Sequence, residues 1–183
     1  YFDRVWRPEQ LPGALLGAMR VLTDPVETGA ATVAIPQDVQ AEAFDWPESL
    51  FAPRTWHIAR PLPEKSVIAR AAEVIRSAQK PMIVAGGGVI YSGATAALAS
   101  FVSKTGIPVG QSQAGKGAVP YDHPQSVGAV GSTGTTAANA LATEADVIIG
   151  IGTRYSDFTS ASRTAFNNPD VRFVNINVAS IDS

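Results

Sequence analysis

A glycine-rich stretch in the middle of the chain, GQSQAGKG at residues 110–117, comes close to two chemical motifs. A phosphate-binding P-loop has Gly, four free positions and Gly-Lys-Ser/Thr, because the final hydroxyl binds the magnesium that accompanies a nucleoside triphosphate. Gly117 occupies that position and has no hydroxyl. A nucleophile elbow has Gly-x-Ser-x-Gly, but Ser112 is followed two residues later by Ala114. Neither motif is complete.

The residues after this stretch also exclude both motifs. Pro120 and Pro124 prevent a helix from starting where a P-loop or a nucleophile elbow requires one. His123 is near Ser112 in sequence, but this proline-rich turn does not suggest a catalytic triad. We therefore predict no catalytic residue here. We interpret the stretch as a loop that touches a ligand held by another domain, with Gly115, Lys116 and Gly117 as candidate contacts.

A second loop, Gly86-Gly87-Gly88, follows an apolar strand directly and precedes a helix expected to start near Gly93. Glycine allows a backbone to approach a phosphate, and a helix N-terminus favours anions. The spacing is not Gly-x-Gly-x-x-Gly, because Tyr91 occupies the third glycine position. A tight turn without a ligand is the alternative.

A third loop follows the apolar run DVIIGIG and contains Thr153, Arg154 and Asp157. The planar guanidinium of Arg154 suits two-point binding of a phosphate or a carboxylate. A salt bridge between Arg154 and Asp157 is the alternative. These three residues complete the set of candidate cofactor-binding positions.

The composition excludes several classes of function. The 183 residues are 45% hydrophobic with a net charge of −2, and they contain no run of Lys or Arg that would indicate nucleic acid or an anionic membrane as a partner. There is no cysteine, and the two histidines, His57 and His123, are far apart, so we predict no metal site. No apolar run is long enough to cross a membrane, and a cytoplasmic protein is expected.

Helices and strands are expected to alternate in the second part of the chain. Continuous apolar strands between amphipathic helices predict an α/β fold with a three-layer, Rossmann-like parallel sheet. Ligands bind such sheets at the carboxyl ends of the strands, where the three loops emerge. The expected helices are 9–22, 68–78, 94–102 and 137–145, and the expected strands are 31–36, 81–86, 106–111, 146–152 and 171–178.

Three stretches, VAIPQDVQAEAFDWP, PMIVAGGGVIYSGA and the long run from QAGKGAVPYDHP to GIGTRYSDFT, resemble the thiamine-diphosphate enzymes of the acetohydroxyacid synthase type. The resemblance implies that residues 1–40 end an N-terminal pyrimidine-binding domain and that 41–63 form a linker. Residues 64–183 would be the central domain, with the NAD/FAD-binding fold of this family, truncated at its C-terminus. Tyr1 in place of methionine also leads us to expect a middle piece of a longer protein.

SQAGKGAVPYDHP points to the branch of the family that acts in myo-inositol breakdown. The resemblance then implies hydrolysis of a ring carbon–carbon bond in 3D-(3,5/4)-trihydroxycyclohexane-1,2-dione to give 5-deoxyglucuronate. Thiamine diphosphate and Mg²⁺ would be bound by domains outside this chain, which alone would be inactive. It also implies a homo-oligomer, a dimer or a tetramer, with the neighbouring cofactor-binding domains as partners.

Two alternatives remain. The chain could be the FAD-binding central domain of an acetohydroxyacid synthase-like enzyme, since some relatives hold FAD or ADP in this domain. Asn175 and Asn177, at the end of the last strand, replace the acid that often binds ribose and argue against a dinucleotide. A stand-alone nucleotide-binding module, such as a sirtuin-like one, is the other alternative, although sirtuins would need zinc-binding cysteines.

Overall fold

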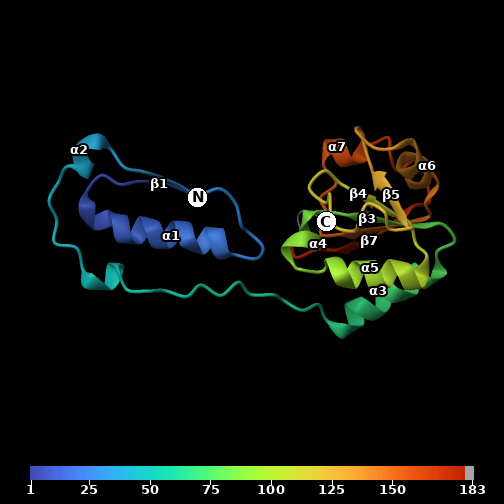
Figure 1. The fold of residues 1–183 in the computed structure, drawn as a ribbon, viewed down its shortest axis with the longest axis horizontal. Helices are drawn as coiled ribbons and strands as arrows, with labels where there is room; N and C mark the ends of the chain where they lie inside the picture. The colour runs from blue at the N-terminus through green and yellow to red at the C-terminus, as the bar shows by residue number, and fades with distance from the viewer. Residues whose placement is uncertain (180–183) are drawn as a thin grey trace. The chain divides into compact units, whose positions relative to one another are not determined.

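The structure is a computed structural model that describes residues 1–179 (Figure 1). The chain divides into two compact units, Tyr1–Pro61 and Leu62–Ser183. The last four residues of the predicted central domain, 180–183, lie outside the described range.

The first unit packs one helix, α1 (Leu11–Thr23), against a small parallel sheet of β1 (Phe2–Arg4) and β2 (Thr32–Ala34). Pro12 is tolerated because it lies in the first turn of α1, where the backbone N–H has no helical partner. The core of the unit contains Val5, Ala14 and Val39. Short helical segments complete it: η1 (Pro8–Gln10), α2 (Gln37–Gln40) and η2 (Glu48–Leu50).

Part of the segment predicted as a linker packs against α1. Pro47, Leu50 and Trp56 face Leu16 and Met19 of the helix around a small cavity of about 180 Å³. This part of the chain therefore belongs to the first unit. The assignment of the units to named domains stays a prediction.

The second unit is built on a five-stranded sheet in which every pair of neighbouring strands is parallel. This confirms the predicted α/β fold class. The strand order is β5-β4-β3-β6-β7. The strands are β3 (Pro81–Ala85), β4 (Val109–Gln111), β5 (Ser126–Ala129), β6 (Val147–Ile151) and β7 (Arg172–Ile176).

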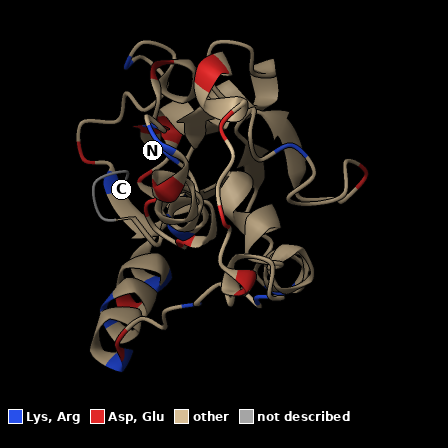
Figure 2. Cartoon of the chain, turned by 90° about the vertical axis from the view of Figure 1, so that its left-hand side faces the viewer, with Lys and Arg blue, Asp and Glu red and all other residues tan. Residues whose placement is uncertain are grey.

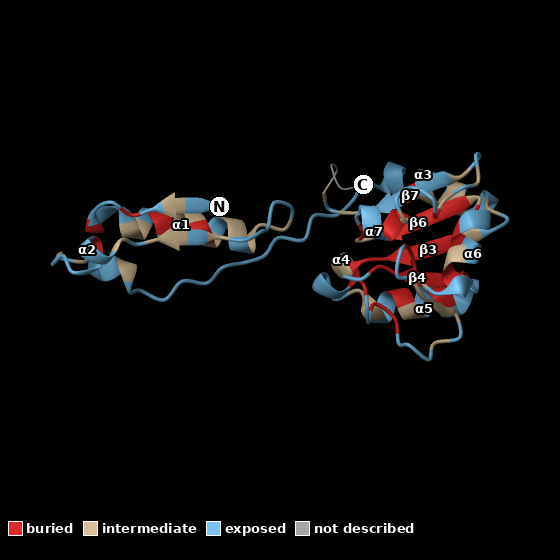
Figure 3. Ribbon diagram, turned by 90° about the horizontal axis from the view of Figure 1, so that it is seen from above, coloured by how far each residue is buried: buried red, intermediate tan, exposed pale blue. Residues whose placement is uncertain are grey.

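Helices cover both faces of this sheet, as Figure 1 shows. Alternate residues of a strand point to opposite faces. Ile83 and Ile149 therefore share one core with α3 and α5, while Met82 and Ile148 share another with α6. Figure 3 shows the central strands buried between more exposed helices. The helices are α3 (Lys65–Ser77), α4 (Gly87–Tyr91), α5 (Thr95–Thr105), α6 (Thr136–Glu144) and α7 (Asp157–Ser160).

Two parts of this unit differ from the sequence expectation. The helix expected over 94–102 is present as α5, but a separate short helix, α4, precedes it and was not expected; the two are divided at Gly93, whose φ of +69° suits glycine. Strand β5 was not expected at all. It is four residues long and contains Gly128 at φ +88°.

Acidic and basic residues are interspersed along the described chain (Figure 2). Lys80 and Glu144 form a 3.0 Å ion pair on the surface. Among residues 1–179, no helix has both the length and the apolar character that a membrane crossing requires.

Candidate functional site

The strand order places a crevice next to β3. Counted in chain order, the sheet reads 3-2-1-4-5, so the chain runs outward from β3 in one direction and then returns to add β6 on its other side. In such sheets, ligands bind outside the carboxyl ends of the strands at this point of reversal. The loops after β3, β4 and β6 all begin at that edge.

The glycines after β3 pack against the loop after β6. Gly86 N–H donates to Ile151 O and Gly88 N–H donates to Gly152 O, each at 2.9 Å. A Cβ at position 88 would lie 2.7 Å from Gly152 Cα, closer than real contacts allow. These glycines are therefore required by the contact between the two loops. This supports the alternative of a tight turn at this point.

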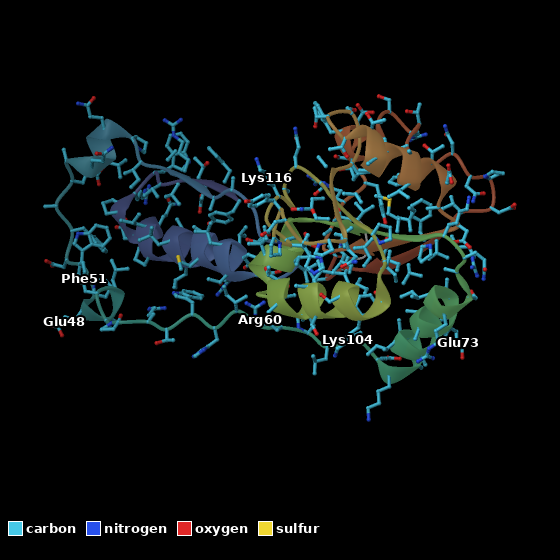
Figure 4. The ribbon with its side chains drawn as sticks, turned by 45° about the vertical axis from the view of Figure 1, so that its right-hand side comes forward. Glu48, Phe51, Arg60, Glu73, Lys104 and Lys116 are labelled. Carbon is cyan, nitrogen blue, oxygen red and sulfur yellow. The ribbon has the colours of Figure 1, made fainter. Side chains whose placement is uncertain are left out.

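The stretch after β4 forms turns and contains no helix, as expected for residues 112–120. Ser112 is 6% exposed, and its Oγ accepts the Gly115 N–H at 3.2 Å. The buried Gln111 side chain accepts the Gly117 N–H at 2.7 Å. Ser112 therefore stabilises a turn, and the loop is held in place by its own residues. Lys116 lies on its exposed part (Figure 4).

The loop after β6 combines a buried and an exposed side. Thr153 is 6% exposed, and its carbonyl accepts a hydrogen bond of 3.0 Å from the Asn177 side chain. Arg154 and Asp157 are exposed. Asp157 Oδ2 accepts a 3.4 Å hydrogen bond from the Ser162 hydroxyl. Ser156 caps the N-terminus of α7.

These loops enclose a cleft of about 360 Å³. Of the predicted contacts, Gly87, Gly88, Thr153 and Arg154 line it. The other predicted contacts are not among its lining residues: Gly86 and Gly115 are packed against neighbouring backbone, whereas Lys116, Gly117 and Asp157 lie on exposed parts of the loops. The structure thus brings the three loops together as expected, but not every residue of each loop.

Eight lining residues were not among the predicted contacts: Ser112, Gln113, Ala114, Gly152, Ser156, Phe158, Thr159 and Asn177. Gln113 lies within the glycine-rich stretch itself, and only this position in the sequence could have identified it as a lining residue. Phe158 and Thr159 belong to α7, whose four residues give no helical periodicity in the sequence.

The lining supplies hydroxyls, amides, one aromatic ring and the cation Arg154, and no carboxylate. Such a set can bind a small polar or anionic group. Among the described residues, no group of three or more His, Asp or Glu side chains is placed to hold a metal ion. The site therefore offers groups that can bind a small polar ligand.

The expectation about Asn175 and Asn177 requires correction. A ribose-binding acid follows the glycine loop by about 20 residues, which here is the end of β4, whereas β7 is an edge strand. Gln111 occupies the end of β4 and is engaged with Gly117. Asn175 accepts a 2.9 Å hydrogen bond from the Tyr155 hydroxyl, and burial raises the pKa of that phenol. Asn177 alone of the two lines the cleft.

Residues 68–182 match the family described as "Thiamine pyrophosphate enzyme, central domain". The match covers more than half of the chain, which therefore belongs to this family and contributes a central domain of a thiamine-pyrophosphate enzyme.

The curated relatives carry a more particular name. Proteins named 3D-(3,5/4)-trihydroxycyclohexane-1,2-dione hydrolase from Clostridium perfringens and Clostridium tetani are 50% and 51% identical to the chain over 179 and 180 residues. Each alignment covers 98% of this chain and 28% of the relative, so the chain spans less than a third of their length.

A solved structure gives the same fold. It is described as that of a thiamin diphosphate-dependent enzyme isolated from Mycobacterium smegmatis, and it superposes with a TM-score of 0.70 at 22% identity. The superposition covers 99% of this chain and 34% of that one.

Proposed function

We propose that the chain is the central part of a longer thiamine-diphosphate-dependent hydrolase. In this proposal, the complete protein cleaves a ring carbon–carbon bond of 3D-(3,5/4)-trihydroxycyclohexane-1,2-dione and releases 5-deoxyglucuronate in myo-inositol breakdown. The observation that carries the proposal is the identity of 49–51% with curated hydrolases of that name across 98% of the chain. The family match at residues 68–182 independently supports the cofactor class.

The described residues do not fit the cofactor itself. Mg²⁺ prefers several oxygen ligands, carboxylates among them, and the described residues contain no acidic cluster that could supply them. In the proposal, thiamine diphosphate and Mg²⁺ are therefore bound by parts of the protein outside this chain. Thiamine diphosphate supplies the electron sink for bond cleavage when bound. The contribution of this chain is to hold the loops that face the neighbouring domains.

The three loops are the part of this chain that would contact the neighbouring domains. We propose that Lys116 and Gly117, on the exposed part of the loop after β4, meet the edge of the substrate site in a neighbouring domain. Arg154 and Thr153 would bind a small polar group in the cleft. A bound dinucleotide is disfavoured, because Gln111 replaces the ribose-binding acid and its oxygen is occupied by Gly117.

The experiment that tests the function uses the complete protein with thiamine diphosphate and Mg²⁺. Incubation with the cyclic dione should give 5-deoxyglucuronate, detected by mass spectrometry, and omission of thiamine diphosphate should abolish the product. The 183-residue chain alone should be inactive under the same conditions. A protein that purifies with bound flavin and condenses pyruvate, without hydrolysing the dione, would instead establish the acetohydroxyacid synthase-like function.

We further propose that the complete protein is a cytoplasmic homo-oligomer, a dimer or a tetramer, as its resemblance to this family implies. Light scattering of the complete protein after size-exclusion chromatography measures its mass directly. A monomeric mass in an active preparation would contradict this part of the proposal.

A further inference from the structure

His123 joins the loop after β4 to helix α5. Its Nε2 lies 3.0 Å from Ser103 Oγ, and its Nδ1 accepts a 3.3 Å hydrogen bond from the Gln125 N–H. Since Nδ1 acts as an acceptor, a neutral ring carries its proton on Nε2 and donates it to Ser103. The Ser103 hydroxyl in turn donates to Ala99 O at 2.8 Å. The imidazole therefore cannot accept the serine proton, and this pair is not a nucleophilic dyad.

The contact holds the end of the loop in place. His123 N–H donates to Pro120 O, and His123 O accepts from Ser126 N–H at 2.8 Å, at the start of β5. The Gln125 carbonyl accepts the Val109 N–H at 2.8 Å, which connects the same turn to β4. The loop that ends here begins at Ser112, which lines the cleft.

We propose that His123 is a proton-sensitive positioning residue for the β4–β5 loop, defined as residues 112–125. The neutral ring holds the turn before β5 through the Gln125 N–H, and the protonated ring releases it. An imidazolium donates from both nitrogens, so its Nδ1–H would face the Gln125 N–H and that hydrogen bond would be lost. Because the bond needs the neutral form, it is complete at high pH and disappears as the pH falls.

Histidine suits this role because its charge changes between about pH 5 and 8. The charged residues adjacent in sequence to this pair are Lys104, which follows Ser103 in α5, and Asp122, which precedes His123. Tyr121, also on the loop, is 93% exposed. Strands β4 and β5 contain no ionisable residue. The His123 ring is thus the ionisable group whose hydrogen bonds hold this turn.

Hydrogen exchange of the complete protein at pH 8.0 and pH 5.5 tests the proposal, with each rate normalised to the intrinsic rate at that pH. The amide of Gln125 should lose protection by about fivefold at the lower pH, the factor that corresponds to one hydrogen bond of typical net strength. The amide of Ala138, which donates to Thr135 Oγ1 in α6, should keep its protection.

Three variants separate the effect of protonation from that of packing. His123→Gln cannot gain a proton, and His123→Asn also keeps an oxygen able to accept the Gln125 N–H, so neither should show the pH dependence. Ser103→Ala retains the imidazole ring and should therefore keep the pH dependence of Gln125 protection. Equal protection of Gln125 at both pH values in the wild type would overturn the proposal. So would a pH dependence that persists in both His123 variants, or an equal loss of protection at Ala138.

Discussion

Lys116 extends from the exposed part of the β4–β5 loop, next to Gly117, whose φ of +95° favours glycine. The backbone of this part is held by Gln111 and Ser112, so the lysine is presented on a fixed support. The role of a residue in these loops depends on whether its own atoms are already engaged in contacts within the loop. Gly88 and Ser112 serve the architecture of the loops, whereas Lys116 is available to contact a neighbouring domain.

Replacing Lys116 by alanine in the complete protein should lower kcat/KM by about tenfold or more, because a hydrogen bond to a charged group contributes roughly 1.5 to 3 kcal/mol. The affinity for thiamine diphosphate, measured by calorimetry, should stay nearly unchanged. Lys65→Ala, an exposed position at the start of α3, is the matched control. Loss of cofactor binding in Lys116→Ala would contradict the proposed division between domains.

Asp146 makes stability depend on pH. The backbone N–H of Gln79, together with that of Lys80, donates to its carboxylate and holds the pKa of Asp146 below its ordinary value. A lowered folded-state pKa adds stability that is complete above the ordinary aspartate pKa of about 3.9 and is lost as the pH falls through the folded-state value. Asp146→Asn should therefore be less stable than wild type at pH 7.

Denaturant midpoints at pH 7 and pH 3 check this sign. The difference in unfolding free energy between wild type and Asp146→Asn should narrow at pH 3, because this pH lies below the ordinary aspartate pKa, where the unfolded chain takes up a proton and part of the stability from the lowered folded-state pKa is lost. Glu73→Gln, an exposed position on α3, removes the same charge without these backbone partners and should behave like the wild type. A gap that is constant across pH would show that the carboxylate charge is unimportant.

Among the elements, the central strands and the helices on them carry the packing energy of the second unit. Leu98 on α5 is 4% exposed and Ile149 on β6 is 1% exposed. Replacing either by alanine should lower the free energy of unfolding by about 2 to 5 kcal/mol, because a cavity remains in a packed core. Leu62→Ala, at a side chain that is 91% exposed, should change it by less than about 0.5 kcal/mol. Unchanged denaturant midpoints for both core variants would mean that the core is misplaced.

The turn after α7 contains three consecutive non-glycine residues with positive φ, namely Ala161, Ser162 and Arg163. The left-handed conformation costs a non-glycine residue roughly 1 to 2 kcal/mol. Glycine avoids this cost, but its larger conformational entropy in the unfolded state cancels part of the gain in stability. Arg163→Gly should therefore raise the free energy of unfolding by about 0.5 to 1 kcal/mol. Arg70→Gly, within α3, should lower it by about 1 kcal/mol. Chemical denaturation of both variants measures the two signs, and destabilisation by Arg163→Gly would reject this account of the turn.

An element could be predicted from the sequence where its side chains form a recognisable apolar pattern. Strands β3 and β6 are continuous apolar runs and were predicted from sequence, whereas β5 has no such run. In α1 the predicted apolar face included Leu15 and Leu22, yet these are 40% and 47% exposed while Ala14 and Ala18 are buried. Periodicity identifies the helix, but it does not show which side meets the sheet. The position of the three loops at one edge could be predicted, because the strands of a parallel sheet all end there. The contacts within each loop could not, because they depend on distances that the sequence does not contain.

For the whole molecule, the glycine-rich stretch forms turns at an edge of the sheet and lacks the helix that follows a P-loop. The isolated chain should show no measurable binding of Mg-ATP, because the stretch lacks the magnesium-binding hydroxyl and the following helix. Gly117→Ser should not create binding, since residues 112–120 still form turns. Isothermal titration with Mg-ATP checks both proteins. Micromolar affinity in either would contradict this interpretation of the loop.

The close contact between Gly88 and Gly152 also limits how this protein can be re-engineered. A Cβ at Gly152 would lie 2.6 Å from Gly88 Cα, so any other residue at position 88 or 152 collides with the opposite loop. A library that randomises position 88 or position 152 should therefore consist mainly of destabilised variants. Loops grafted from a relative to alter ligand preference should be exchanged as a matched pair, with both glycines retained.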